Sequence, residues 1–145
     1  MWIAFLVGFL TCCWAAYTDY KARIIPNTTA LINIIAAILI FKSSLIKNGH
    51  LWLALSMFVV MFAMWLFKLI GAGDVKLLSS LVLLLGYYAF FAIFFALVLF
   101  IVVGYVQSRR KTENFWKFKM PLAPFLMPGM VLNIILYLII IKNIV

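Results

Sequence analysis

Two aspartates are the residues of this sequence whose type and position point most directly to chemistry. The chain has only three acidic residues, and Asp19 and Asp74 each stand at the end of a long apolar run. A carboxylate in such a place is costly unless it is compensated, so its presence indicates a functional site. The third acid, Glu113, lies in a basic connector. The pair Asp19 and Asp74 is therefore the first candidate for catalysis.

Two carboxyl groups that approach each other can hydrolyse a peptide bond. Because they cannot both ionise comfortably, they share one proton. The ionised group accepts a proton from water, while the protonated group donates a hydrogen bond to the scissile carbonyl. Other catalytic arrangements have little support, since the chain has one histidine, no nucleophile elbow and no HExxH motif. Cys12 and Cys13 are adjacent and form no CxxC pair. We therefore expect no metal and no cofactor.

Each aspartate also has a structural interpretation. Asp74 alone is typical of a helix cap or a partner of the helix dipole. Asp19, together with Lys21 and Arg23, is compatible with an interfacial charge cluster. The joint occurrence of both motifs on one predicted membrane face favours the catalytic interpretation.

The composition predicts the elements that must position this pair. The chain is 69% hydrophobic and 10% charged, whereas about a quarter of the residues in soluble domains are charged. We expect an integral membrane protein of the all-α class, a bundle of six transmembrane helices forming a single domain over residues 1–145. A spanning helix needs about 20 mostly apolar residues. The expected spans are 2–18, 27–41, 51–70, 74–87, 88–106 and 124–141.

Several residues between and within these runs have predicted structural roles. Pro26 should break the chain before Asn27 caps the second helix, and Gly86 should separate the fourth helix from the fifth. One helix across both runs would be too long for a single crossing. Asn33 and Asn133 are expected to form interhelical hydrogen bonds. His50 is expected to be a solvated loop residue.

The basic residues indicate the orientation. The first, third and fifth connectors hold nine Lys and Arg residues, and the opposite side holds three. The positive-inside rule then predicts an external N-terminus and places both aspartates at the cytoplasmic face of the cell membrane. These cations lie between the apolar runs, where topology signals belong. We therefore interpret the net charge of +9 as a topology signal and expect no nucleic-acid partner.

Three segments resemble a known family. Asp19-x-x-x-Arg23-x-Ile25-Pro26-Asn27 and Gly71-x-Gly73-Asp74-x-Lys76 are similar to the two signature motifs of the type IV prepilin peptidases, membrane aspartic peptidases of the GxGD class. A third segment, Pro121-Leu122-Ala123-Pro124-Phe125-Leu126 followed by Gly129, resembles the Pro-x-x-Pro-Phe element before the last helix of that family.

The resemblance implies that Asp19 and Asp74 are the catalytic pair. Supporting or substrate-binding roles then fall to Arg23, Pro26, Asn27, Gly71, Gly73, Lys76, Pro121 and Pro124. The two glycines are small enough to admit a substrate backbone, and the two cations tune the local charge. The implied reaction is cleavage of the basic leader of a prepilin or pseudopilin at the cytoplasmic face. The resemblance is to the short members, including those of Flp/Tad-type pili, without the N-terminal methyltransferase domain and its four-cysteine zinc site.

Other functions are compatible with the same residues. One is a non-catalytic membrane component of a pilus or secretion assembly. A second is an ion or proton carrier, which is disfavoured because a carrier should hold its carboxylates near the bilayer midplane. A third is another intramembrane GxGD peptidase of the presenilin kind, whose first aspartate motif lacks the Arg-x-Ile-Pro-Asn continuation. The oligomeric state is left open by the sequence.

Overall fold

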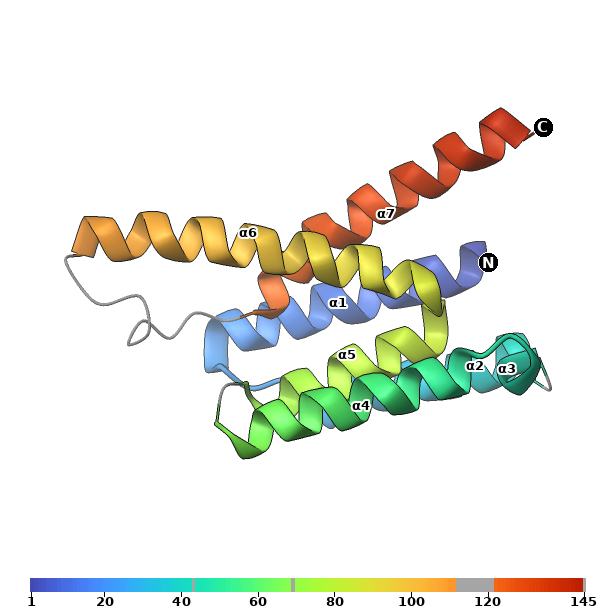
Figure 1. Cartoon of the computed structure of the whole chain (residues 1–145), viewed down its shortest axis with the longest axis horizontal. Helices are drawn as coiled ribbons and strands as arrows, with labels where there is room; N and C mark the ends of the chain where they lie inside the picture. The colour runs from blue at the N-terminus through green and yellow to red at the C-terminus, as the bar shows by residue number, and fades with distance from the viewer. Residues whose placement is uncertain (43, 69, 112–121, 145) are drawn as a thin grey trace.

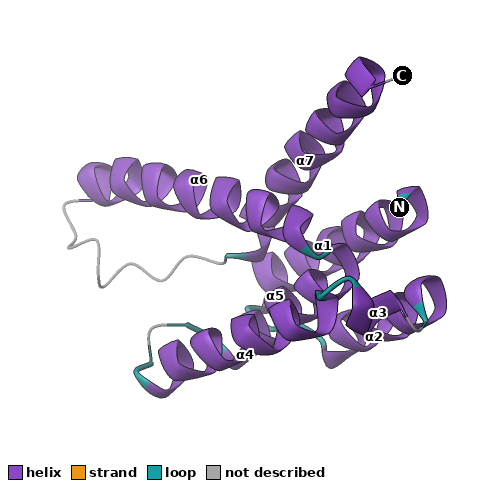
Figure 2. Cartoon of the chain, turned by 45° about the vertical axis from the view of Figure 1, so that its right-hand side comes forward, coloured by secondary structure: helices purple, strands orange, loops and turns teal. Residues whose placement is uncertain are grey.

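The computed structural model describes residues 1–42, 44–68, 70–111 and 122–144, and in these residues it contains helices and connections but no strand (Figures 1 and 2). The predicted all-α class is confirmed. The helices are α1 (Trp2–Ala22), α2 (Asn27–Phe41), α3 (Ser44–Lys47), α4 (His50–Leu66), α5 (Ala72–Leu85), α6 (Tyr87–Lys111) and α7 (Ala123–Ile144).

Each predicted apolar run forms one long helix, and the short α3 is an addition that the sequence did not indicate. The predicted separation at Gly86 is confirmed. Gly86 ends α5 with a φ of 59°, a left-handed conformation that glycine adopts without the steric cost other residues pay. The chain therefore turns back between α5 and α6.

Several helix boundaries differ from the prediction: α4 ends at Leu66, before the expected residue 70, and α6 continues to Lys111. α1 continues past Asp19 to Ala22 and ends where Arg23 takes a left-handed conformation, its N–H bonded to the Asp19 carbonyl at 2.9 Å. The prediction that Asn27 caps α2 is wrong, because Pro26 is the N-cap and Asn27 is the first helical residue. No side chain caps the start of α2, and the Asn27 amide is available for another contact.

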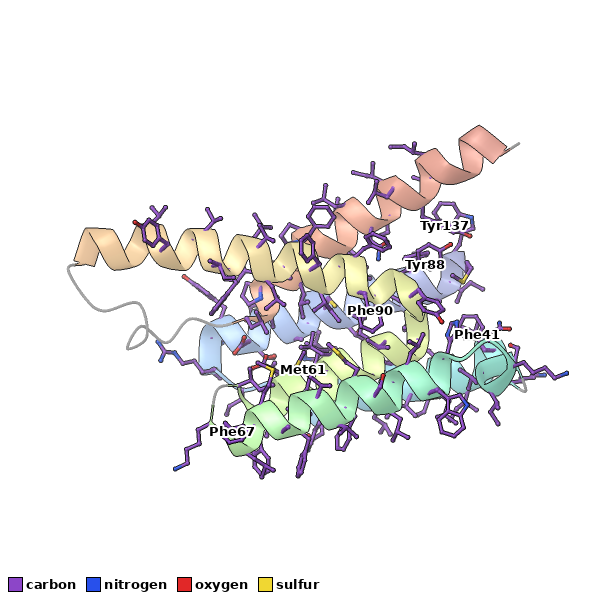
Figure 3. All side chains as sticks on the ribbon, in the orientation of Figure 1. Phe41, Met61, Phe67, Tyr88, Phe90 and Tyr137 are labelled. Atoms are coloured by element: carbon purple, nitrogen blue, oxygen red, sulfur yellow. The ribbon has the colours of Figure 1, made fainter. Side chains whose placement is uncertain are left out.

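Two segments, Trp2–Ala22 and Tyr87–Val106, are long and apolar enough to cross a membrane. Three further helices are apolar but shorter, at Asn27–Phe41, His50–Leu66 and Ala123–Ile139. Large apolar side chains are exposed along all of these helices (Figure 3). Soluble proteins rarely expose apolar surface on this scale, which favours a lipid environment, and the six spans stay a prediction.

Helix α5 occupies the centre of the bundle. It packs against α1, α2, α4 and α6, and from Val75 onward most of its side chains are buried. Because short α5 is enclosed by its neighbours, its first turn, which carries Asp74, is held by the packing of the whole helix. In Figure 1 this first turn and the C-terminal end of α1 lie at the same end of the bundle, at the left of the view.

A network of buried side-chain hydrogen bonds connects three of these helices. Thr11 of α1 donates to the Asn33 side-chain oxygen at 2.8 Å, and the Asn33 amide of α2 donates to the Ser80 hydroxyl of α5 at 3.2 Å. Asn33 is fully buried. The predicted interhelical role of Asn33 is confirmed, and that of Asn133 is too, since its amide donates to the Tyr88 carbonyl and joins α7 to α6.

The opposite end of the bundle is closed by a histidine and by aromatic rings. The expectation that His50 is solvated is wrong. His50 is buried, with its Nδ1 3.3 Å from the Leu83 carbonyl and its ring against Gly86. Tyr88 and Tyr137, whose ring centroids are 5.5 Å apart, lie side by side in Figure 3. In the sequence His50 lies between two apolar runs, which is typical of a solvated connector. Its burial depends on Gly86 in the turn after α5, and no pattern near His50 indicates that contact.

Candidate active site

One cavity at the shared end of α1 and α5 brings the two sequence motifs together. Its volume is about 250 Å³, and it is lined by Asp19, residues 23–25 and residues 71–74. All of these residues belong to the two motifs, which are about fifty positions apart in the chain. The two carboxyl groups are close enough to interact electrostatically. The juxtaposition that acid–base hydrolysis requires is therefore present.

Asp19 is held by the start of α7. Its side chain is buried in the last turn of α1, and its Oδ2 accepts a hydrogen bond from the Ala123 backbone N–H at 3.1 Å. Ala123 is the first residue of α7, so the carboxyl group meets the positive end of that helix dipole. The Arg23 guanidinium also interacts electrostatically with it. Burial of the Asp19 carboxyl group disfavours its ionised form, and these two partners offset part of that effect.

Asp74 has a different environment. It is the third residue of α5, and its Oδ2 accepts the Gly71 N–H at 3.3 Å. This bond is the one that a capping role predicts. The second oxygen, Oδ1, is buried and has no hydrogen-bond partner among the described residues. An unpaired buried carboxylate oxygen is costly, so capping alone does not explain this placement. Burial, and then the nearby Asp19, disfavour the ionised form of Asp74.

Gly73 lets the two motifs pack against each other. A Cβ at this position would lie 2.9 Å from the Cβ of Ile25, closer than real Cβ contacts allow. The expectation was that Gly73 admits a substrate backbone. The structure gives it a second role, because any larger residue would push the 23–25 segment away from the start of α5.

Lys76 and Asn27 form a second link between the motifs. The Lys76 ammonium donates to the Asn27 side-chain oxygen at 2.9 Å, and both residues are exposed at the end of the bundle. Freed from a capping role, the Asn27 amide connects α2 to α5. Lys76 thus stands beside the pocket and takes no part in its lining.

The remaining predicted site residues are distributed around the pocket. Arg23 and Gly71 line it, Pro26 shapes the turn into α2, and Pro124 is the second residue of α7. Pro121 lies outside the described residues. The Ala123 N–H was missed by sequence reasoning, because a backbone donor has no residue type to reveal it. Only the resemblance of segment 121–129 pointed to this part of the chain.

The arrangement provides two unequal carboxyl groups at one opening. Within the described part of the chain, no three His, Cys, Asp or Glu side chains gather at one place. The groups at this opening that can polarise a substrate include the two carboxyls, Arg23 and backbone amides. A shared proton between Asp19 and Asp74 suits water activation and carbonyl polarisation.

The comparisons with known proteins agree with this geometry. A family model described as the type IV leader peptidase family matches residues 5–106. The matched segment contains both aspartate motifs and ends before the start of α7. Comparison with curated proteins and with solved structures gives no significant match.

Proposed function

Because the chain belongs to the type IV leader peptidase family, we propose that it is a membrane aspartic endopeptidase that removes the basic leader of prepilin-like proteins. The observation that carries this proposal is the pocket lined by Asp19, Asp74 and the residues of their two motifs. Two interacting carboxyls in one opening are the minimal equipment for metal-free peptide hydrolysis. The family indicates the class of reaction, peptide-bond hydrolysis, and the pocket lining identifies the residues that we propose carry it out.

The environments of the two carboxyls suggest unequal roles. Asp19, which accepts the Ala123 N–H, acts as the base that takes a proton from water. Asp74 carries the shared proton and donates it from its unpaired Oδ1 to the scissile carbonyl. The tetrahedral intermediate collapses when Asp19 passes the proton that it took from water to the leaving amine and Asp74 recovers its proton from the intermediate's hydroxyl group, so that water is added across the peptide bond and the C–N bond breaks. This assignment follows the general division of labour in carboxylate pairs.

The proposed setting is the cytoplasmic face of the cell membrane. The apolar helix surfaces and two candidate spans support embedding in lipid. The cations Lys21, Arg23, Lys68 and Lys76 are at the end of the bundle that carries the aspartates, which supports a cytoplasmic orientation under the positive-inside rule. A leader made on the cytoplasmic side would then reach the pocket.

Substitution of the carboxyls tests the proposal. Asp19→Asn and Asp74→Asn keep size and hydrogen-bonding capacity but remove the shared proton. Each variant is expressed with a reporter that has a basic leader, a glycine and an apolar helix, and cleavage is followed by intact mass. The charge-matched control is Glu113→Gln, which neutralises the third acid of the chain. We expect cleavage by the wild type and by the control, and none by either Asn variant.

The same experiment separates the proposal from its main alternative. A non-catalytic component of a pilus or secretion assembly would leave the reporter uncut by every form of the protein. Cleavage by an Asn variant at near wild-type rate would show that the carboxyl pair is not the catalytic group. The pocket shared by both motifs favours the enzyme, because an assembly factor has no need of two adjacent carboxyls.

A further inference from the structure

A second cavity of the described structure lies outside the catalytic pocket. It has a volume of about 430 Å³ and follows the surface between α2 and α4, with α5 as its floor. Its apolar walls are formed by Leu31, Ile34, Leu51, Leu55, Phe58 and Leu83. Ligand cavities have volumes of about 300–1,000 Å³, so this groove, the α2–α4 groove, is large enough to hold part of another molecule.

The α2–α4 groove lies next to the catalytic pocket, and a third hollow stands between them. The end of the groove nearest the aspartates is formed by Asn27 and Lys76, and this smaller hollow shares Phe58 and Lys76 with the groove and Ala72 with the catalytic pocket. A chain leaving the catalytic pocket therefore meets an apolar path that begins two residues after Asp74. The only charged residue that lines the groove is Lys76, at this end.

The floor of the groove suits a helix. Small or hydroxyl-bearing residues line it, namely Ser79 and Ser80 of α5 with Ala30 of α2 and Ala54 of α4 beside them, and each of them is buried. In membranes such residues allow two helices to approach closely, whereas lipid tails have no requirement for them. The segment of α5 from Lys76 to Leu83 is about 10 Å long, which is about two helical turns.

We propose that the α2–α4 groove binds the apolar helical segment of the peptide substrate that adjoins the scissile bond. This inference rests on the proposed peptidase function and adds the place where the retained part of the substrate docks. About two turns of an apolar helix lie along α5, with the cleavage site at the aspartates and the groove end at Lys76 facing the polar side of the membrane.

Crosslinking tests the location. A photoreactive benzoylphenylalanine is placed at Leu55, which lines the groove and is 52% exposed. Its matched control is Val60 on the same helix, 55% exposed and outside the groove. The full-length protein is reconstituted in phosphatidylethanolamine–phosphatidylglycerol vesicles with the reporter that has a basic leader, a glycine and an apolar helix. We expect the reporter to be crosslinked at position 55 and not at position 60.

Kinetics provide a second, independent measurement. Ala54→Phe fills the floor of the groove, and Val60→Phe adds the same ring on the outer face of α4. We expect Ala54→Phe to raise KM for the reporter by about tenfold with little change in kcat, since contacts in an apolar pocket of this kind are worth about 10–200-fold. Thermal unfolding in detergent tests whether both variants are folded.

The outcomes separate the groove from the peptidase proposal. If the wild type cleaves the reporter while crosslinks at positions 55 and 60 are equal and KM is unchanged in Ala54→Phe, the groove inference is wrong and the peptidase stands. Crosslinks at position 55 to lipid that the reporter does not displace would assign the groove to lipid and overturn the inference. If the wild type cleaves nothing, the peptidase proposal itself fails. If Ala54→Phe is misfolded, the crosslinks at positions 55 and 60 alone decide whether the groove binds the reporter.

Discussion

At the scale of single residues, the contacts between the two motifs matter as much as the carboxyls themselves. Gly73 packs on Ile25, and Lys76 donates to Asn27. These contacts join Ile25 and the start of α2 to the first turns of α5, about fifty positions later in the chain. Two interpretations of Gly73 then compete, namely close packing against Ile25 and access for a substrate backbone.

A double-mutant cycle distinguishes them. Gly73→Ala places a Cβ 2.9 Å from that of Ile25, so we expect the 23–25 segment to shift and cleavage to fall by about tenfold or more, because about 1.4 kcal/mol of lost transition-state stabilisation corresponds to tenfold. Ile25→Gly removes the opposing atoms. If packing is the cause, the double variant recovers activity relative to Gly73→Ala, and the two substitutions are strongly non-additive.

Additive losses in this cycle would point to the substrate instead. In that case the added methyl obstructs the peptide whatever residue occupies position 25. Val60→Ala on the outer face of α4 serves as the control for a change in side-chain size that touches neither motif. The measurement is the initial rate of reporter cleavage at equal protein concentrations. Thermal unfolding of separate samples tests whether each variant is folded.

At the scale of helices, the site depends on where α7 begins. α7 starts at Ala123, against α1, and its first N–H is a hydrogen-bond donor to Asp19. The donor Ala123 lies outside the segment matched by the family model, whereas the acceptor Asp19 lies inside it. It assigns the last helix a part in the chemistry that its composition does not indicate.

Proline at the first position of a helix keeps the backbone conformation but removes the N–H. We therefore expect Ala123→Pro to lower kcat with little change in KM, because only the hydrogen bond to the Asp19 carboxylate is lost. A hydrogen bond to a charged group is worth about 1.5–3 kcal/mol, which corresponds to a loss of about 10–100-fold. Ala123→Ser keeps the N–H and should retain activity.

The comparison of kcat with KM separates this role from a structural one. A variant that merely loosened α7 would lower the melting temperature, and both Ala123→Ser and Ala123→Pro, which enlarge a buried side chain, would be affected alike. An unchanged kcat in Ala123→Pro would show that the bond to Asp19 makes no contribution to catalysis.

At the scale of the whole molecule, the arrangement has two chemically different ends. The aspartates and four cations occupy one end, while His50, Tyr88 and Tyr137 close the other. Orientation in the membrane decides whether a leader on the cytoplasmic side can reach the pocket. It is therefore a property of the whole molecule on which the proposed function depends.

Thiol labelling in intact cells tests this orientation. Single cysteines are placed at Asn48 and at Ala22, both exposed, in a background where Cys12 and Cys13 are alanine. The excess of cations at the end that carries Ala22 predicts that this end is cytoplasmic. An impermeant reagent should label position 48 directly and position 22 only after permeabilisation. The reverse pattern would put the aspartates on the outer face.

Helix order and the pairing of the two motifs could be predicted from the sequence, because apolar runs and charged connectors are local patterns. The roles of Asn33 and Gly86 were likewise visible as a polar residue in an apolar run and a glycine at a turn. The Ala123 N–H, the link from Lys76 to Asn27 and the burial of His50 were not. Each depends on how helices far apart in the chain pack, and no local pattern records that.

The buried chain from Thr11 through Asn33 to Ser80 has a mechanical consequence. α1, α2 and α5 are joined in mid-bundle by these side chains, and α2 is joined to α5 again at the catalytic end by the hydrogen bond from Lys76 to Asn27. Two contacts at different heights oppose sliding and pivoting of α2 against α5. We therefore expect an opening that admits a substrate to displace α4, α6 or α7 more readily than it separates α2 from α5.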